Sequence, residues 1–443
     1  MQRDEILETL RRHESRNITH VDPAAGWPLV WERARGCSVW DSEGRRHLDL
    51  TAAFGVAAAG HANPRVVAAA RRQAGLLLHG MGDVHPHRGK AELVAELSRR
   101  TFGRWVPGGV GKSILTGSGS DAVEAALKTA RLATGRAGVI AFEGAYHGLG
   151  YGALNATHRE HFRGRFRDQL GGFVEFVPFP ACATCDCVSS APPCGQIATI
   201  GRAMDALAAS RPIGAVLIEP IQARGGIRVP PEGFLTALRQ WCDRHGALMI
   251  LDEIYTGFGR TGRWFACEHE GVVPDLVCLG KALTGGFPMG ACVGRAELMD
   301  QAWPESDGEA IHTSTFLGHP VGCAMALAQM TELEARGLVE RAATEGAWLR
   351  GKLELLAKSG DRLQLRAVGR GLMAGLEVRT RDGAGAGHLV VQTMQRLLKD
   401  RILILPEGAG AEVLSLTPPL TIGRREFSRA LGVIVARLME TAS

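Results

Sequence analysis

One lysine stands alone in a long uncharged stretch of the sequence. Lys281, in the segment LGKALTGGFPMG (279–290), is the only charged residue between Asp275 and Arg295. Lysine is rarely buried completely without a partner, so its place among apolar residues needs a chemical reason. Burial favours the neutral amine over the ammonium ion, and a neutral amine can form a Schiff base with a carbonyl group. The segment therefore predicts a nucleophilic lysine.

A small polar loop that opens a helical pattern offers a site for a phosphate group. In GSGSDAVEAALKTAR (117–131), backbone amides at the predicted helix start can hold an anion, and Gly119 permits its close approach. Ser118 and Ser120 supply hydroxyl groups. Ordinary helix capping by Ser or Asp is the alternative interpretation. The loop is not a P-loop, because no Gly-Lys-Ser/Thr follows it.

Two further signals follow predicted strands. Asp252 ends the strand-like ALMILD, and a carboxylate at the tip of a buried strand needs a partner. Tyr146 and His147 follow the strand-like GVIAF, and the tyrosine offers a planar ring. Taken singly, the aspartate fits a structural cap equally well, and a Tyr-His pair is usually found at the edge of a core.

Together these signals fit one cofactor, pyridoxal 5'-phosphate (PLP). PLP requires a lysine for its Schiff base, a phosphate cradle, an aromatic ring beside its own ring, and a carboxylate at its pyridine nitrogen. That carboxylate keeps the nitrogen protonated, which makes the ring an electron sink. The sequence therefore predicts a PLP enzyme with Lys281 and Asp252 as its catalytic residues.

Alternating strands and helices must position these residues. Such alternation favours an α/β fold with a mostly parallel sheet, whose functional sites gather at the carboxyl ends of the strands. Beyond about residue 320 the pattern changes to long helices followed by two strand-like runs, and a chain of 443 residues is long for one domain, so we expect two lobes. The predicted strands are 112–116, 138–142, 215–219, 247–252, 275–279, 290–294, 371–379 and 401–406, and the predicted helices are 121–133, 232–245, 321–337 and 340–358.

Composition and charge argue against several classes of partner. The net charge of +5 comes from 51 basic and 46 acidic residues spread along the chain, and only the loop 159–169 is densely basic. An isolated basic loop is usually a solvated surface, so we expect no nucleic-acid binding. The charged start of the chain lacks a signal-peptide core, and no apolar run approaches the ~20 residues of a membrane span. We expect a cytoplasmic protein that does not bind membranes.

Longer motifs occur in the order of a known family. They include GHANPRVVAAARRQ (60–73), IEPIQARGGIRVPPEGFL (218–235), LDEIYTGFGRTG (251–262), GKALTGGFPMGACVG (280–294) and LTPPLTI (416–422). With these motifs the chain resembles the class III aminotransferases, which include the 4-aminobutyrate, ornithine and acetylornithine enzymes. The resemblance implies a PLP-dependent transferase of fold type I that acts on small amines and keto acids.

The same resemblance implies an architecture and a partner. Residues 60–320 are expected to form the large PLP-binding domain, and residues 1–59 and 321–443 a small α+β domain built from both termini. A homodimer with shared active sites is also implied, because Thr315 matches a family threonine that reaches the phosphate of the neighbouring subunit.

The resemblance also assigns roles at the cofactor. Glu219 matches a glutamate near the substrate side, although a buried carboxylate satisfied by the backbone is the alternative. His147 and Tyr255 complete the expected cofactor contacts. By the resemblance, the phosphate is bound by Gly119 and Ser120, the ring lies between Tyr146 and Ile254, its nitrogen pairs with Asp252, and Lys281 carries the aldimine.

Three departures from the family pattern affect substrate choice. Tyr255 stands in place of a glutamine, and Leu149 and Ser415 stand where arginines usually grip carboxylates. These losses predict weaker use of 4-aminobutyrate and glutamate, and a preference for a less acidic amine. The rival possibility is a replacement anchor, for which the candidates are Arg163, Arg165 and Arg224.

A cysteine cluster allows two interpretations. The segment CATCDCVSSAPPC is compatible with a structural zinc or iron–sulfur site. A loop of free thiols, or one disulfide, explains it equally well. The four cysteines are Cys182, Cys185, Cys187 and Cys194.

Three functions compete for this scaffold. Transamination would move an amino group from an amine or amino acid to a 2-oxo acid through pyridoxamine phosphate. Racemisation or epimerisation of an amino acid would use the same Lys281 and Asp252 but return the proton to the substrate carbon. A non-catalytic PLP-binding protein is disfavoured by the intact lysine and aspartate. Family frequency favours transamination.

Overall fold

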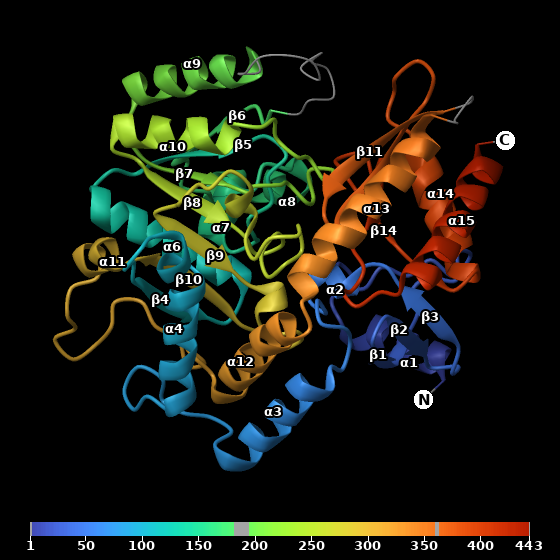
Figure 1. Cartoon of the computed structure of the whole chain (residues 1–443), viewed down its shortest axis with the longest axis horizontal. Coiled ribbons are helices and arrows are strands. Elements are labelled where there is room, and N and C mark those ends of the chain that lie inside the picture. Colours follow the sequence, from blue (N-terminus) through green and yellow to red (C-terminus); the bar gives the residue numbers. More distant parts are fainter. Residues whose placement is uncertain (1, 181–194, 359–362, 443) are drawn as a thin grey trace.

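A 7-stranded sheet forms the centre of the larger lobe. The computed structural model describes residues 2–180, 195–358 and 363–442. In the strand order β4-β10-β9-β8-β7-β5-β6, β10 runs antiparallel to both β4 and β9, and the other pairs of neighbours are parallel (Figure 1). The prediction of a mostly parallel α/β sheet is therefore confirmed. The strands are β4 (Gly111–Thr116), β5 (Gly138–Phe142), β6 (Val174–Val177), β7 (Ile213–Ile218), β8 (Leu248–Asp252), β9 (Leu276–Leu279) and β10 (Gly290–Arg295).

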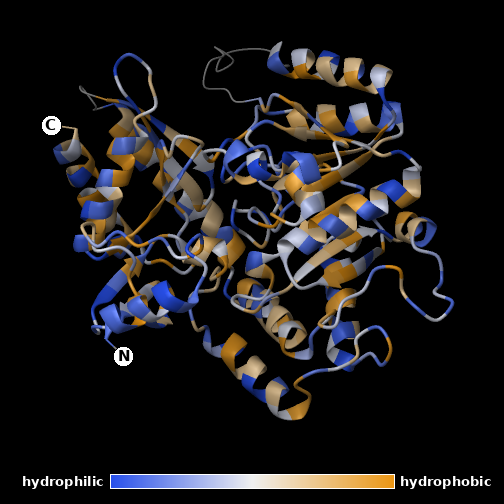
Figure 2. Ribbon diagram, turned by 180° about the vertical axis from the view of Figure 1, so that it is seen from behind, coloured by the Kyte–Doolittle hydropathy of each residue, from blue (hydrophilic) through white to orange (hydrophobic). Residues whose placement is uncertain are grey.

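Helices cover both faces of this sheet, which explains why its strands are continuous apolar runs. Successive side chains of β7 enter different cores: Leu217 packs with α6 (Gly119–Thr134), and Val216 belongs to the core that includes α10 (Phe234–His245). Figure 2 shows both hydrophilic and hydrophobic residues on the covering helices, as one buried and one solvated side require. The remaining helices of this lobe are α3 (Pro64–Leu76), α4 (Arg88–Arg100), α5 (Phe102–Trp105), α7 (Tyr151–Ala156), α8 (Glu160–Arg163), α9 (Gly195–Ser210), α11 (Ala296–Ala302) and α12 (Pro320–Ala335), with 3-10 turns at Gly164–Gln169, Ala266–His269 and Lys281–Leu283.

The smaller lobe joins the two ends of the chain. One 4-stranded sheet has the order β1-β2-β3-β13, in which Leu48 of β3 pairs in parallel with Ile402 of β13. A second sheet has the order β11-β12-β15-β14, and both termini lie in this lobe (Figure 1). Its elements are α1 (Arg3–His13), β1 (Trp31–Arg35), β2 (Ser38–Asp41), β3 (Arg46–Asp49), α13 (Leu338–Lys358), β11 (Gln364–Arg370), β12 (Met373–Arg379), α14 (Gly387–Lys399), β13 (Ile402–Leu403), β14 (Leu405–Glu407), β15 (Val413–Leu416) and α15 (Arg424–Thr441).

A turn with a strained backbone brings one side chain of the smaller lobe to a cavity that faces the large sheet. In α2 (Ala52–Gly55) the residues Ala52, Ala53 and Phe54 have φ angles of 47°, 48° and 61°. A left-handed backbone costs about 1–2 kcal/mol for each residue that is not glycine. The turn carries Phe54 to the wall of this cavity of about 710 Å³. Across the described residues, none of the helices is both long and apolar enough to cross a membrane.

Candidate active site

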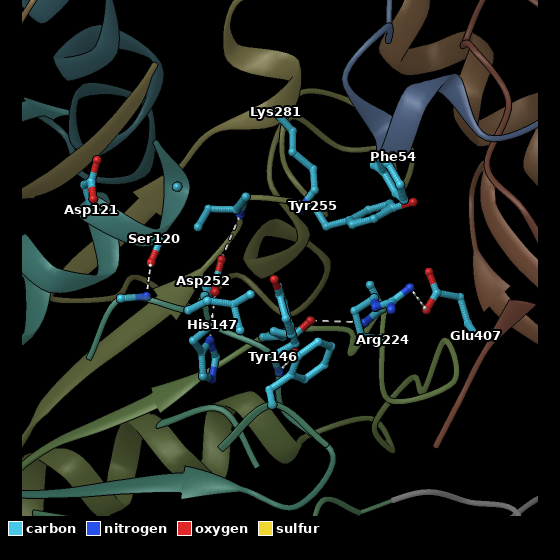
Figure 3. A pocket seen from close by; sticks show the side chains of 18 residues that line it. Phe54, Ser120, Asp121, Tyr146, His147, Arg224, Asp252, Tyr255, Lys281 and Glu407 are labelled. Carbon is cyan, nitrogen blue, oxygen red and sulfur yellow. Dashed lines mark hydrogen bonds and ion pairs between the residues drawn. The ribbon is translucent and has the colours of Figure 1, made fainter. Parts of the chain in front are cut away.

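A cavity of about 710 Å³ opens at the carboxyl ends of the large sheet's parallel strands, between the two lobes (Figure 3). Such a position is where open α/β sheets bind ligands. Most of the residues that the sequence analysis selected line it together. They are Gly119, Ser120, Tyr146, His147, Glu219, Asp252, Ile254, Tyr255 and Lys281.

Lys281 enters the cavity from the turn that follows β9. Its φ of 42° lies in the left-handed region, a strain of about 1–3 kcal/mol that the surrounding packing must hold. Its Nζ lies 4.6 Å from the centre of the Tyr255 ring (Figure 3). Burial lowers the pKa of Lys281, although Asp252 and Glu219 act in the opposite direction. A larger fraction of neutral, nucleophilic amine follows.

The start of α6 forms a cradle for a phosphate group. Ser118 caps the helix, because its hydroxyl accepts a hydrogen bond from the amide of Asp121 at 3.1 Å. Gly119 leaves no room for a side chain, since a Cβ there would meet Ile254 Cδ1 at 2.9 Å. Ser120 Oγ accepts a hydrogen bond from the amide of Gly150 at 3.3 Å. The geometry fits both capping and anion binding, and the open backbone at Gly119 lets an anion approach.

A buried carboxylate and an imidazole lie at another wall of the cavity. Asp252 Oδ2 is 2.8 Å from His147 Nδ1, and Asp252 Oδ1 accepts a hydrogen bond from the Ile254 amide at 3.1 Å. His147 Nε2 is buried and has no hydrogen-bond partner among the described residues. Tyr146 contributes its ring, which packs edge-on against Phe162 with centroids 5.3 Å apart. The carboxylate, lysine, aromatic ring and helix start fit PLP, whose binding needs these four groups.

Glu219 is largely satisfied by the backbone. Its Oε1 and Oε2 accept hydrogen bonds from the amides of Tyr146 and Ala223 at 3.0 and 3.1 Å. Burial raises the pKa of Glu219 to about 7, with Asp252 adding to the rise. These contacts favour the structural alternative, although the side chain still borders the cavity.

An ion pair in the cavity wall escaped the sequence analysis. Arg224 Nη1 lies 3.3 Å from Oε2 of Glu407, a residue at the end of β14 in the other lobe (Figure 3). Of the three candidate replacement anchors, Arg224 alone lines the cavity. Arg163 packs over the Phe176 ring, 4.9 Å from its centre, and Arg165 is exposed. No motif marked Glu407, because it ends a short strand far along the chain from Arg224.

Comparison with known proteins decides the family. The profile of the family described as Aminotransferase class-III matches residues 21–438. The chain belongs to the class III aminotransferases. An acetylornithine aminotransferase of Methanopyrus kandleri is 35% identical over 421 residues, covering 95% of this chain and 96% of that protein. A 5-aminovalerate aminotransferase of Pseudomonas aeruginosa is 36% identical over 422 residues, covering 94% of each chain.

Solved transaminases have the same fold. An (S)-enantioselective omega-transaminase from Thermomicrobium roseum matches with a TM-score of 0.89 at 27% identity, and the match covers 100% of both chains. The predicted PLP-dependent transferase fold of type I is thereby confirmed. So is the prediction of an aminotransferase, and membership of this family implies PLP as cofactor.

Of the remaining residues that the sequence analysis discussed, Thr315 and Ser415 do not line the cavity of this aminotransferase chain. Thr315 is exposed and is not among the residues that line it. Leu149 does line it, whereas Ser415 is buried in β15, opposite Gly375 of β12. Tyr255, in the usual place of a glutamine, directs its hydroxyl to Thr417 Oγ1 at 3.3 Å.

The cysteine cluster lies outside the described residues, so a zinc or iron–sulfur site there stays a prediction. Within residues 2–180, 195–358 and 363–442, no group of three or more His, Cys, Asp or Glu side chains could hold a metal ion. The six other cysteines are free thiols; five are buried, and Cys37 is partly buried.

Proposed function

We propose that this aminotransferase binds PLP in the cavity at the carboxyl ends of the sheet and moves an amino group from an amine or amino acid to a 2-oxo acid. The observation that carries the proposal is that Lys281, Asp252 and the start of α6 all line this one cavity. When bound, PLP supplies a carbonyl group for the amine and an electron sink for the carbon beside it.

Each of these residues would have a separate task. Lys281 Nζ would hold the cofactor covalently between turnovers and, once displaced by the substrate amine, move a proton from the substrate carbon that carries nitrogen. Asp252, fixed by His147 and the Ile254 amide, would hold a proton on the pyridine nitrogen. Gly119 and Ser120 would bind the phosphate at the positive end of α6.

Racemisation would use the same two residues, Lys281 and Asp252. It is not favoured, because the relatives at 33–36% identity are named as aminotransferases or transaminases. The names of two relatives, 5-aminovalerate aminotransferase and putrescine aminotransferase, support an amine at the end of a carbon chain as the donor here.

An equilibrium measurement tests this proposal. The holoenzyme is mixed with one amine in the absence of any oxo acid, and its absorbance spectrum is followed. A transaminase should convert to the amine form of the cofactor and release one carbonyl product per site. A racemase should stay in the aldehyde form while inverting its substrate, which would overturn the proposal.

We also propose a homodimer in which Thr315 reaches the active site of the partner chain. Exposed apolar side chains from two segments support this, because large apolar patches on a surface mark interaction sites. The segments touch: the His79 and Phe316 rings lie 5.3 Å apart, and Thr313 donates a hydrogen bond to Asp83. The exposed apolar residues are Leu76, Leu77, Leu78, Met81, Val84, Ile311 and Phe316.

Sedimentation and cofactor titration test the dimer. A Thr315→Ala chain should stay dimeric but bind PLP more weakly, whereas a monomeric wild-type chain would contradict the proposal.

The domain boundaries 1–59, 60–320 and 321–443 remain our proposal for the lobes, supported by the pairing of β3 with β13 from opposite ends of the chain.

A further inference from the structure

Arg224 is presented to the cavity by a loop that both lobes hold. The loop follows β7, and Gln222 and Arg228 exchange two backbone hydrogen bonds of 3.0 and 2.9 Å across it. The Arg224 carbonyl accepts a hydrogen bond from the amide of Gly408 at 3.3 Å. Its backbone and its side chain therefore both contact the segment 407–408 of the smaller lobe, which fixes the guanidinium at the cavity wall.

The guanidinium has spare hydrogen-bonding capacity. It carries five N–H donors, and the described residues provide one side-chain acceptor for them, Glu407, at the long distance of 3.3 Å. The Arg224 side chain is 33% exposed, whereas that of Glu407 is 5% exposed. A ligand entering the cavity therefore meets the arginine, and the glutamate lies behind it.

The surroundings of Arg224 are otherwise low in available negative charge. Glu219 already accepts two backbone hydrogen bonds. Arg159 lies nearby, because the charge of Arg224 contributes, after burial, to lowering the pKa of Arg159. The Arg159 guanidinium carbon lies 5.4 Å from the ring centre of Phe162, which lines the cavity, whereas Arg159 is not among the lining residues. An oxyanion beside Arg224 would thus be attracted by its guanidinium, and Arg159, which does not line the cavity, adds a second positive charge nearby.

We infer that Arg224 selects substrates that carry a carboxylate in addition to the reacting amine or carbonyl group, and that Glu407 holds its side chain in place until such a substrate competes for it. The inference rests on the proposed function, because it assigns the substrate class of that same cavity. It makes Arg224 a replacement for the arginines absent at Leu149 and Ser415, so substrates that carry a carboxylate remain accessible to this enzyme. A planar guanidinium can bind a carboxylate through two parallel hydrogen bonds.

A matched pair of amines isolates the carboxylate. 5-Aminopentanoate and butylamine have the same carbon chain beyond the amine and differ in one carboxylate. In the Arg224→Met holoenzyme, the ratio of their kcat/KM values should fall about tenfold to a hundredfold, because a hydrogen bond to a charged group is lost. The ratio for Arg224→Lys should lie between those of wild type and Arg224→Met, since lysine keeps the positive charge but cannot form two parallel hydrogen bonds to a carboxylate. Arg165→Met, an exposed arginine outside the cavity, should keep the wild-type ratio.

A binding measurement separates this inference from the proposed function. Glutarate, a dicarboxylate without an amine, is titrated into each holoenzyme by calorimetry. Wild type should bind it, Arg224→Met should bind it at least about tenfold more weakly, and Glu407→Gln should bind it more tightly because the competing charge is gone. If the protein transaminates no amine but shows this pattern of glutarate affinities, the proposed function is wrong and the role of Arg224 in carboxylate binding stands.

Two results would overturn the assignment of Arg224. One is equal glutarate affinity in wild type and Arg224→Met, with unchanged melting temperatures. The other is a preference for pentane-1,5-diamine over 5-aminopentanoate that Glu407→Gln abolishes and Arg224→Met does not. The second result would make Glu407 a receptor for a cationic substrate group instead.

Discussion

His147 Nδ1 lies 2.8 Å from Asp252 Oδ2, and both side chains are buried beside the cavity that Lys281 enters. The second carboxylate oxygen of Asp252 accepts the Ile254 amide. Each oxygen of the carboxylate thus has a fixed partner, which sets the plane of the group. We therefore expect His147 to act through Asp252, as a positioning residue.

Replacing His147 should loosen Asp252 without removing it. We expect His147→Ala to lower kcat about tenfold to a hundredfold, because a hydrogen bond to a charged group is lost. His147→Asn, which keeps a short N–H donor, should recover part of the rate. Stopped-flow rates and PLP affinity of both variants check this. Equal rates in the Ala and Asn variants would indicate that the side chain only fills space.

Removing the Asp252 charge should separate cofactor binding from catalysis. Asp252→Ala should still bind PLP through the start of α6 but should lose at least about a hundredfold in kcat, since the protonated pyridine nitrogen is no longer stabilised. Asp168→Ala removes an exposed carboxylate outside the cavity and serves as the control. A nearly wild-type rate in the Asp252 variant would exclude the proposed role.

Lys281 should be needed for covalent cofactor binding and for proton transfer. Lys281→Ala should lose more than about a thousandfold in turnover and release PLP on gel filtration, while its melting temperature as apoprotein stays near wild type or rises, because a buried amine is removed. The exposed Lys352→Ala variant should behave as wild type. Turnover retained in Lys281→Ala would contradict the mechanism.

Gly119 should not tolerate even one methyl group. A Cβ at this residue would lie 2.9 Å from Ile254 Cδ1, so Gly119→Ala should destabilise the fold by about 1–3 kcal/mol and weaken PLP binding. The matched control is Gly432→Ala in α15, where a Cβ meets nothing within 4 Å. That change should stabilise the protein by up to about 1 kcal/mol. Thermal unfolding of both apoproteins, with PLP titration, measures the contrast.

Carboxylate binding should weaken as the pH rises through about 7. Burial raises the pKa of Glu407 to about 7, so this side chain is mostly protonated below that pH and ionised above it. The ionised form competes with a substrate carboxylate for Arg224, and the protonated form does not. The glutarate dissociation constant should therefore increase from pH 6 to pH 8, and Glu407→Gln should flatten the change. The charged groups that face Glu407 are Arg224, Glu219, Arg159 and Lys281.

The sequence predicted the large sheet well, because its strands are buried on both faces and appear as unbroken apolar runs. β6 (Val174–Val177) was missed: this short edge strand has its middle residues, Glu175 and Phe176, only partly buried. The single predicted strand 401–406 is two strands, β13 and β14, that join different sheets. A local pattern does not reveal which sheet a strand enters.

The cofactor side of the cavity was predictable for a related reason. Asp252 ends a strand of the mostly parallel sheet, and Lys281 and Tyr146 each follow one, so their proximity follows from topology. The Arg224 and Glu407 contact joins residues 183 positions apart, from two lobes, and no periodicity links them. The left-handed turn at Ala52–Gly55 was equally hidden, because two alanines and a phenylalanine give no sign of a positive φ.

The pairing of β3 with β13 also bears on how the chain is made. Leu48 leaves the ribosome about 350 residues before its partner Ile402. At about 5–20 residues per second, β3 waits roughly 20–70 s for its neighbour, with one edge unpaired. During that interval the newly made N-terminal hairpin is open to aggregation and to chaperones, while the large sheet can already assemble. Synthesis rate and chaperone supply should therefore affect the yield of folded protein.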